Sequence, residues 1–283
     1  GSCVDFSGKV ILGRSGISTL RMGIGADTGI DSAALEWAFE HGINYFYWGT
    51  SRTSGMRDAI RHLAPRHRDS LIIALQSYDT TGFTTGLSFQ RGLRQLGIDY
   101  ADILILGKRD APLPRRVVDS ALALRDAGLA RHLCVSAHDR SMFAAHVALD
   151  IFDLVMVRYN CAHPGAEREV FPLLENKKDR PGVLCYNTTR WGHLFNADWM
   201  PPGDTTPAPS HLYRFALSHP VVDLVLTAPK TRAQIESNLL VLQQGPLDPD
   251  ERAWLQRVGK FVHGLSPYSN WDFLKQNLRP RRH

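Results

Sequence analysis

Residues 101–138 read ADILILGKRDAPLPRRVVDSALALRDAGLARHLCVSAH. The stretch holds two apolar runs, 101–107 and 132–138, on either side of an amphipathic segment that starts at Arg115 and closes with Gly128. Continuous apolar runs, rather than alternating ones, are typical of strands that are buried on both faces of a parallel sheet. Glycine commonly follows a helix end, because it adopts a left-handed backbone without strain. The stretch therefore predicts a strand–helix–strand unit with parallel strands.

The same alternation continues in both directions along the chain. One further amphipathic segment begins after Asp31, a residue type that caps helix N-termini, and stops at Gly42. Other helices are expected to begin near Gly55, Thr84, Arg140, Glu167, Ser210 and Thr231. Strands are predicted at 19–25, 44–48, 71–78, 101–107, 132–138, 154–160, 182–189 and 222–229. Eight strands alternating with helices over 283 residues predict an α/β fold of the (β/α)8 TIM barrel type.

A doubly wound sheet is the rival architecture, and it is disfavoured because no Gly-x-Gly-x-x-Gly follows the first strand. The whole chain, 1–283, is expected to form one barrel domain. An N-terminal hairpin is expected over 8–18, and an extra helix with a tail over 248–283.

Composition and charge narrow the function classes. Hydrophobic residues make up 43% of the chain and charged residues 22%, and no window approaches 18 uncharged apolar residues, so no membrane partner is expected. The net charge of +5 has no nucleic-acid-binding motif beside it and instead suits an anionic ligand. The cysteines are too widely spaced for a zinc site or a disulfide framework, and they are expected to be buried thiols in a cytoplasmic protein. They are Cys3, Cys134, Cys161 and Cys185.

Three segments resemble the aldo-keto reductase family. Residues 12–25, LGRSGISTLRMGIG, are similar to its N-terminal hairpin and first strand, and residues 38–46, AFEHGINYF, to its entry into strand 2. Residues 228–238, APKTRAQIESN, are similar to the segment that grips the adenosine 2′-phosphate of NADP. The resemblance implies a barrel that binds NADP(H) and, in the family, a carbonyl reduction that uses an Asp, a Tyr, a Lys and a His.

The positions that match these four catalytic residues hold other residue types. The family's Asp-Thr-Ala-x-x-Tyr-Gly corresponds to Tyr47-Trp-Gly-Thr-Ser-Arg52-Thr, which puts Tyr47 at the Asp position and Arg52 at the Tyr position. Gln76 stands at the Lys position and Gly107 at the His position. The resemblance therefore implies that ordinary carbonyl reduction is weak or absent, since losing an acid catalyst alone costs on the order of 10²–10⁴-fold in rate.

Four residues are the candidate catalytic groups. Tyr47 is either a relocated proton donor or a ring packed in the barrel mouth, and Arg52 is either an anion clamp or a surface residue before a helix. Gln76 can form hydrogen bonds but cannot act as a general base. His138 is the best acid–base candidate by type, because histidine titrates near neutral pH.

The resemblance also implies a set of cofactor-binding residues. Ser136 and Tyr186 match family residues at the nicotinamide end, whereas Ala137 and Met156 replace two partners of the carboxamide. Lys230 begins a predicted helix, where backbone donors and the helix dipole favour a phosphate. The adenosine end retains Lys230, Thr231, Gln234 and Asn238.

The candidate substrate-binding residues are Trp48, Lys108, Arg190 and Trp191. Lys108 lies one residue past the family's His position, and neighbouring strand residues point in opposite directions, so Lys108 is expected to line the mouth rather than replace the His. Arg190 and Trp191 suit a flat or anionic ligand by stacking and charge. Aromatic and cationic residues predominate in these loops, which favours an aromatic or acidic small molecule.

Three functions remain open. The leading one is a divergent NADP(H)-dependent oxidoreductase that acts on a small molecule with catalytic groups other than the family's, because hydride transfer belongs to the cofactor. The second is a non-redox isomerase, lyase or cyclase of a biosynthetic pathway on a repurposed barrel. The third is a catalytically inactive NADP(H)-binding protein. No metal ligand set is predicted.

Overall fold

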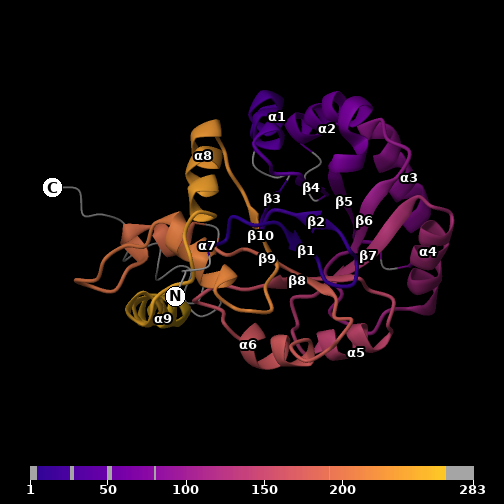
Figure 1. Cartoon of the computed structure of the whole chain (residues 1–283). Helices are drawn as coiled ribbons and strands as arrows, with labels where there is room; N and C mark the ends of the chain where they lie inside the picture. The colour runs from indigo at the N-terminus through magenta and orange to yellow at the C-terminus, as the bar shows by residue number, and fades with distance from the viewer. Residues whose placement is uncertain (1–4, 26–28, 50–52, 80, 191, 266–283) are drawn as a thin grey trace.

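Eight parallel strands close into a barrel, and each strand pairs with the strands that precede and follow it in the sequence (Figure 1). The computed structural model describes residues 5–25, 29–49, 53–79, 81–190 and 192–265. The barrel strands are β3 (Met22–Ile24), β4 (Tyr45–Trp48), β5 (Ile72–Ser77), β6 (Ala101–Leu106), β7 (Ala130–Ser136), β8 (Leu154–Arg158), β9 (Gly182–Tyr186) and β10 (Leu224–Thr227). The predicted barrel fold is confirmed, and each of the eight apolar runs overlaps one barrel strand, although β7 begins at Ala130, two residues before its predicted run.

Helices surround the strands and begin close to the predicted positions (Figure 1). They are α1 (Ser32–Glu40), α2 (Ser54–His67), α3 (Thr85–Leu96), α4 (Arg115–Asp126), α5 (Met142–Ala148), α6 (Ala166–Glu169), α7 (Pro209–Leu217), α8 (Arg232–Val241) and α9 (Pro249–Gly264). Short 3-10 turns are η1 (Arg68–Ser70), η2 (Phe171–Leu173), η3 (His193–Phe195) and η4 (Ala197–Trp199). The caps act as predicted: the Asp31 side chain accepts from the Ala34 N–H at 2.8 Å, and Gly128 after α4 has a φ of +74°.

A two-stranded hairpin closes the amino-terminal end of the barrel. Strands β1 (Val10–Ile11) and β2 (Ser18–Thr19) pair antiparallel, one residue beyond the predicted hairpin at its far end. The Arg14 N–H donates to the carbonyl oxygen of Arg180, just before β9, at 2.9 Å. The hairpin therefore lies across the bottom of the barrel, opposite the carboxyl ends of the strands.

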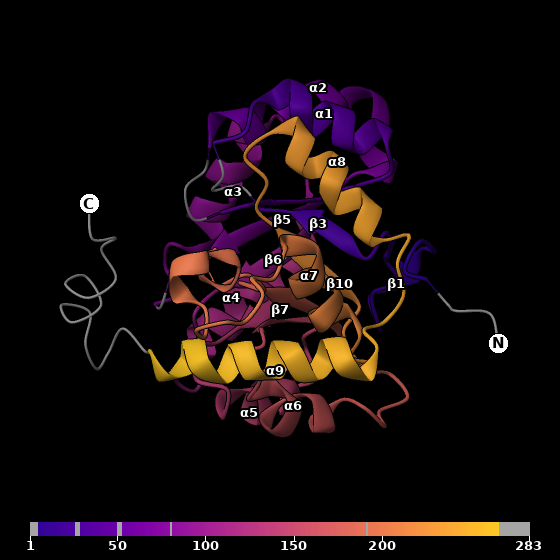
Figure 2. The ribbon, with the colours of Figure 1, turned by 90° about the vertical axis from the view of Figure 1, so that its left-hand side faces the viewer.

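Helix α9 is the predicted extra helix, and it runs across the outside of the barrel below α7 (Figure 2). It comes very close to the loop after β8, since a Cβ atom at Gly259 would lie 1.9 Å from the Cys161 carbonyl oxygen. The three described cysteines, Cys134, Cys161 and Cys185, are buried free thiols, and Cys3 lies outside the described residues. Within the described ranges, no helix has both the length and the apolar character needed to span a membrane.

Buried carboxylates join neighbouring strands near the amino-terminal end of the barrel. Asp223, which is 3% exposed, accepts from the Val183 N–H of β9 at 2.8 Å and binds both terminal nitrogens of Arg180 at 2.8 Å each. Asp102 makes the same two kinds of contact: it accepts from the Ile73 N–H of β5 at 2.9 Å, and it forms an ion pair with Arg68 at 3.0 Å. Each carboxylate satisfies a buried backbone donor and a cation together, which is the condition for burying charge at tolerable cost.

We predict that Asp223→Ala lowers the free energy of unfolding by about 3 kcal/mol, because it removes the counter-charge of Arg180 and the side-chain acceptor of the buried Val183 N–H. Urea unfolding of both proteins measures the difference. The control is Asp119→Ala, whose 65% exposed side chain lies 3.8 Å from Arg115 on α4 and should contribute at most about 0.5 kcal/mol. Equal losses in the two variants would contradict this account.

Candidate active site

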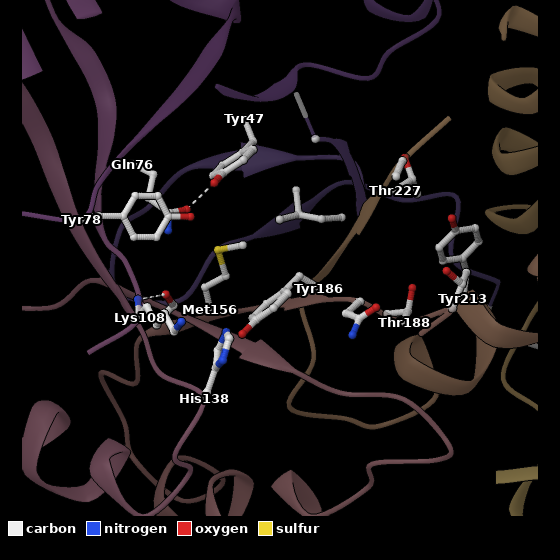
Figure 3. Close-up of a pocket in the computed structure, with 16 residues that line it drawn as sticks. Tyr47, Gln76, Tyr78, Lys108, His138, Met156, Tyr186, Thr188, Tyr213 and Thr227 are labelled. Atoms are coloured by element: carbon white, nitrogen blue, oxygen red, sulfur yellow. Dashed lines mark hydrogen bonds between the residues drawn. The ribbon is translucent and has the colours of Figure 1, made fainter. Parts of the chain in front are cut away.

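A cavity of about 450 Å³ opens at the carboxyl ends of the strands, where ligand sites of such barrels lie. Figure 3 shows side chains that face it from strands around the barrel. The lining residues include four tyrosines, one lysine and one histidine, and among the described residues that line the cavity none is a carboxylate. They are Gly25, Tyr47, Gln76, Tyr78, Lys108, Ser136, His138, Met156, Tyr186, Asn187, Thr188, Thr189, Tyr213, Leu226, Thr227 and Ala228.

The centre of one wall is a hydrogen-bonded pair, Tyr47 and Gln76. Tyr47 pairs with Ala74 in the β4–β5 register, and Gln76 lies two residues further along β5, so both side chains emerge on the same side of the sheet. The Tyr47 hydroxyl donates to Oε1 of Gln76 (Figure 3). The pair is nearly buried, at 7% and 9% exposure. It is uncharged in both members, so this wall offers hydrogen bonding without a fixed charge.

Two glycines make room for this pair. A Cβ atom at Gly107 would lie 1.9 Å from Nε2 of Gln76, and a Cβ atom at Gly49 would lie 2.7 Å from the Tyr47 hydroxyl oxygen. Both distances are far below van der Waals contact, so any side chain at either position requires the pair to move. Tyr47, Gln76, Gly49 and Gly107 therefore form one packing unit.

The lysine and the histidine of the cavity lining, Lys108 and His138, follow the next two strands, β6 and β7. The Lys108 N–H donates to Oγ of Ser136 at 3.0 Å, and the His138 N–H donates to Oδ1 of Asp110 at 2.6 Å. Desolvation lowers the pKa of His138, and the charges of Arg158 and Lys108 add to the effect against the opposing influence of Asp110. His138 therefore favours its neutral form at neutral pH.

Left-handed backbone marks the loops at this end of the barrel. Among the described residues, four other than glycine have a positive φ, and three of them follow β6 or β9: Lys108 at +54°, Asn187 at +55° and Arg190 at +50°. Such conformations cost energy and concentrate at functional sites. Two of the three, Lys108 and Asn187, line the cavity.

Ser136 and Tyr186, the residues expected at the nicotinamide end, both line the cavity. Ser136 ends β7 and is 5% exposed. Tyr186 ends β9, is half-buried and points toward His138 in Figure 3. Burial raises the pKa of Tyr186 to about 12, so it remains a neutral phenol.

Two residues that the sequence pointed to as substrate-binding lie outside the cavity lining. Trp48 is 1% exposed, and its indole N–H donates to the carbonyl oxygen of Thr53 at 3.0 Å. Arg190 is also 1% exposed, and its guanidinium donates to Nε2 of His163 and to Nδ1 of His193, each at 3.1 Å. Arg52 and Trp191 lie outside the described residues.

The residues expected to hold the adenosine phosphate lie at the start of α8, two residues past the cavity edge at Ala228. The Thr231 hydroxyl accepts from the Gln234 N–H at 3.2 Å, and Oε1 of Gln234 accepts from the Lys230 N–H at 2.6 Å. Thr231 and Gln234 thus cap the helix, while Lys230 is exposed. Asn238, one turn further along, is buried at 7% exposure.

Several lining residues were not singled out from the sequence. Tyr78 lies two residues past Gln76 and Thr227 ends β10, so alternation along a strand was the signal that could have identified them. Tyr213 comes from α7, and no local pattern connects it with a strand end. Across the described part of the chain, no group of three or more His, Cys, Asp and Glu side chains is placed to hold a metal ion.

No family model matches the sequence. Among solved structures, the chain is similar to an aldo-keto reductase from Bacillus halodurans in its holo form, with 20% identity, a TM-score of 0.75, and coverage of 89% of this chain and 96% of that one. It is also similar to an aldo-keto reductase from Klebsiella pneumoniae in complex with NADPH, with 21% identity, a TM-score of 0.74, and coverage of 91% and 96%. An aldo/keto reductase structure from the same organism, in complex with NADP and acetate, has 19% identity to this chain and a TM-score of 0.74. The match covers 89% of this chain and 96% of that one. These likenesses establish that the barrel has the fold of the aldo-keto reductases.

We predict that Gly107→Ala lowers the free energy of unfolding by about 1–3 kcal/mol, the usual effect of overpacking, because the new methyl group displaces Gln76. In a Gln76→Ala background the same change should cost much less, since the obstructing amide is gone. Urea unfolding of the double-mutant cycle measures the coupling. Gly8→Ala is the control, because a Cβ atom there meets nothing within 4 Å. If the free-energy changes of Gly107→Ala and Gln76→Ala simply add in the double variant, Gly107 and Gln76 do not pack as one unit.

A second prediction concerns Arg190 and His163. Burial lowers the pKa of His163 from 6.5 to about 4, with further contributions from Arg158 and Arg190. Because the folded state binds this proton less readily than the unfolded state, its contribution to stability is complete above pH 6.5 and is lost as the pH falls toward 4. His163→Gln keeps an acceptor for Arg190 without a titrating ring, so its urea midpoint should fall less steeply with acid. His62→Gln is the control: its side chain is 61% exposed, so its urea midpoint should change with pH as that of the wild type does. If the urea midpoints of His163→Gln and the wild type changed identically with pH, His163 would not be the group responsible for the loss of stability in acid.

Proposed function

We propose that the chain is a divergent relative of the aldo-keto reductases that binds NADP(H) across the barrel mouth and oxidises or reduces a small aromatic or acidic molecule. The proposal rests on one cavity, which runs from the Tyr47–Gln76 pair past Tyr186 to the end of β10, beside the start of α8. A nicotinamide cofactor bound there would supply the hydride.

The residues at the β9–β10 end of the cavity fit such a cofactor. Thr188, Thr189 and Thr227 give this end neutral hydroxyls, and the absence of carboxylates from the described lining leaves nothing there to repel phosphates. Lys230 follows at the exposed start of α8. Structures with the same fold hold NADP or NADPH, which supports this reading.

The residues at the other end would position the substrate and move its proton. Tyr47 is a neutral donor already bonded to Gln76, and an amide cannot lower the pKa of a phenol in the way that a neighbouring cation does. His138, which also lines the cavity, is the alternative proton carrier. With these groups, simple aldehydes would be reduced poorly, and the natural substrate would be one that needs little acid catalysis.

A second candidate function is a non-redox isomerase, lyase or cyclase. The observation that favours it is the packing unit itself, because Tyr47, Gln76, Gly49 and Gly107 fit together as a consistent hydrogen-bonding wall rather than as isolated losses. Such a wall can orient a polar substrate without any cofactor. A protein that binds NADP(H) without catalysing a reaction would share with the oxidoreductase only the use of the cofactor end of the cavity.

We predict that the protein binds NADP(H) more tightly than NAD(H), and that Lys230→Ala weakens NADP(H) binding by about 1–3 kcal/mol, the range for a charge-assisted hydrogen bond. NAD(H) binding should hardly change, since NAD(H) lacks the 2′-phosphate. Calorimetric titration of both proteins with both cofactors measures these differences. Lys260→Ala, at an exposed lysine of α9, is the matched control.

Raised salt should weaken NADP(H) binding further, because an exposed ion pair is screened. Binding of neither cofactor would remove the oxidoreductase proposal and leave the non-redox enzyme as the leading one. Equal binding of both cofactors, unaffected by Lys230→Ala, would limit Lys230 to a role in the scaffold.

A further inference from the structure

Arg158 is the last residue of β8, and its neighbours along and across the sheet line the cavity. Met156, two residues earlier on the same side of the strand, lines the cavity. Across the β8–β9 ladder Arg158 pairs with Tyr186, which also lines it. The positive charge of Arg158 acts on both His138 and Tyr186, so the guanidinium is within electrostatic reach of the cavity's titratable groups.

This guanidinium has no partner among the described residues. Its Nε is shielded from solvent and makes no hydrogen bond there, and no carboxylate forms an ion pair with it. Two partly buried arginines near the amino-terminal end of the barrel are paired with carboxylates, Arg68 with Asp102 at 3.0 Å and Arg180 with Asp223 at 2.8 Å. A half-buried cation without a counter-charge among the described residues is costly, which makes Arg158 a candidate to bind an anionic ligand.

A second cation, Lys108, lies near Arg158. Lys108 lines the cavity together with His138, which is a neutral hydrogen-bonding ring at neutral pH. Asp110 is the nearby carboxylate, and its Oδ1 accepts from the N–H groups of His138 and Asp139, at 2.6 and 2.8 Å. The two cations, Arg158 and Lys108, outnumber this one carboxylate, so this end of the cavity favours an anion.

We propose that Arg158, with Lys108 and His138, forms a subsite for the carboxylate of a small aromatic acid. The planar guanidinium suits the two oxygens of a carboxylate, and Tyr78, Tyr186 and Tyr47 supply flat walls for the body of the ligand. Lys108 and His138 lie across the cavity from Thr227 and Tyr213 in Figure 3, so the subsite is separate from the end proposed for the cofactor phosphates.

The backbone argues for a carboxylate rather than a phosphate. Phosphates are typically held by free N–H groups at a helix start or in a loop cradle. Here the N–H groups of Lys108 and Arg109 are bonded to Ser136, and those of His138 and Asp139 to Asp110. Side-chain donors alone remain, which suits a singly charged, planar anion.

This inference builds on the proposed function, because it names the substrate class for the same cavity. The test is calorimetric titration of the full-length protein with benzoate, its neutral counterpart benzamide, and phenyl phosphate, each with and without NADP⁺. Wild type should bind benzoate at least tenfold more tightly than benzamide. Arg158→Gln should lose about 10- to 100-fold in benzoate affinity and leave benzamide unchanged. The benzoate affinity of Arg158→Lys should lie between those of the wild type and Arg158→Gln, because lysine keeps the charge without the planar guanidinium.

The matched control is Arg131→Gln, at an exposed arginine near the amino-terminal end of β7, which should bind benzoate as the wild type does. Thermal unfolding checks that each variant folds. If Arg158→Gln does not fold, Lys108→Gln is used instead, and we expect it to lose less benzoate affinity. Equal affinity for benzoate and benzamide, a preference for phenyl phosphate, or unchanged binding in the folded variants would overturn the proposal. If the protein binds NADP(H) but not benzoate, only the carboxylate subsite is refuted. If it binds benzoate through Arg158 but does not bind NADP(H), only the redox function is refuted.

Discussion

The pairing of β10 with β3 closes the sheet, and the candidate site depends on this closure. It brings Gly25, near the start of the chain, beside Ala228, near its end, and both line one cavity. Buried carboxylates at the opposite end of the barrel tie neighbouring strands through Asp102 and Asp223. The amino-terminal end thus carries interactions that hold the barrel, and the carboxyl-terminal end carries the cavity, a division that barrels of this kind share.

Most of the fold could be predicted from the sequence, because its determinants are local. Apolar runs such as 101–107 mark strands buried on both faces, and Asp31 and Gly128 mark helix ends through capping and left-handed backbone. The strand ends were less predictable. The predicted run 182–189 extends past the observed end at Tyr186, because Asn187 turns into a left-handed conformation that apolar patterning does not reveal.

The candidate site was only partly predictable, for reasons of geometry. Tyr47, Gln76 and Lys108 were singled out through the resemblance to the family's catalytic positions and His138 by its residue type, and all four line the cavity because strand ends converge on one rim. Trp48 is the immediate neighbour of Tyr47, yet alternation along the strand turns it away. Tyr213 reaches the cavity from a helix, and Arg158 is distinguished by its lack of a partner among the described residues. Neither property is visible in a sequence, since each depends on what lies nearby in space.

The close fit of Gln76 against Gly107 makes the two positions depend on each other. With Gln76 in place, the space beside Gly107 is filled, so a side chain introduced there alone would disturb the wall. A shorter residue at position 76 would have to accompany it. The same dependence links Gly49 to Tyr47. Any redesign of this wall therefore has to change the paired positions together.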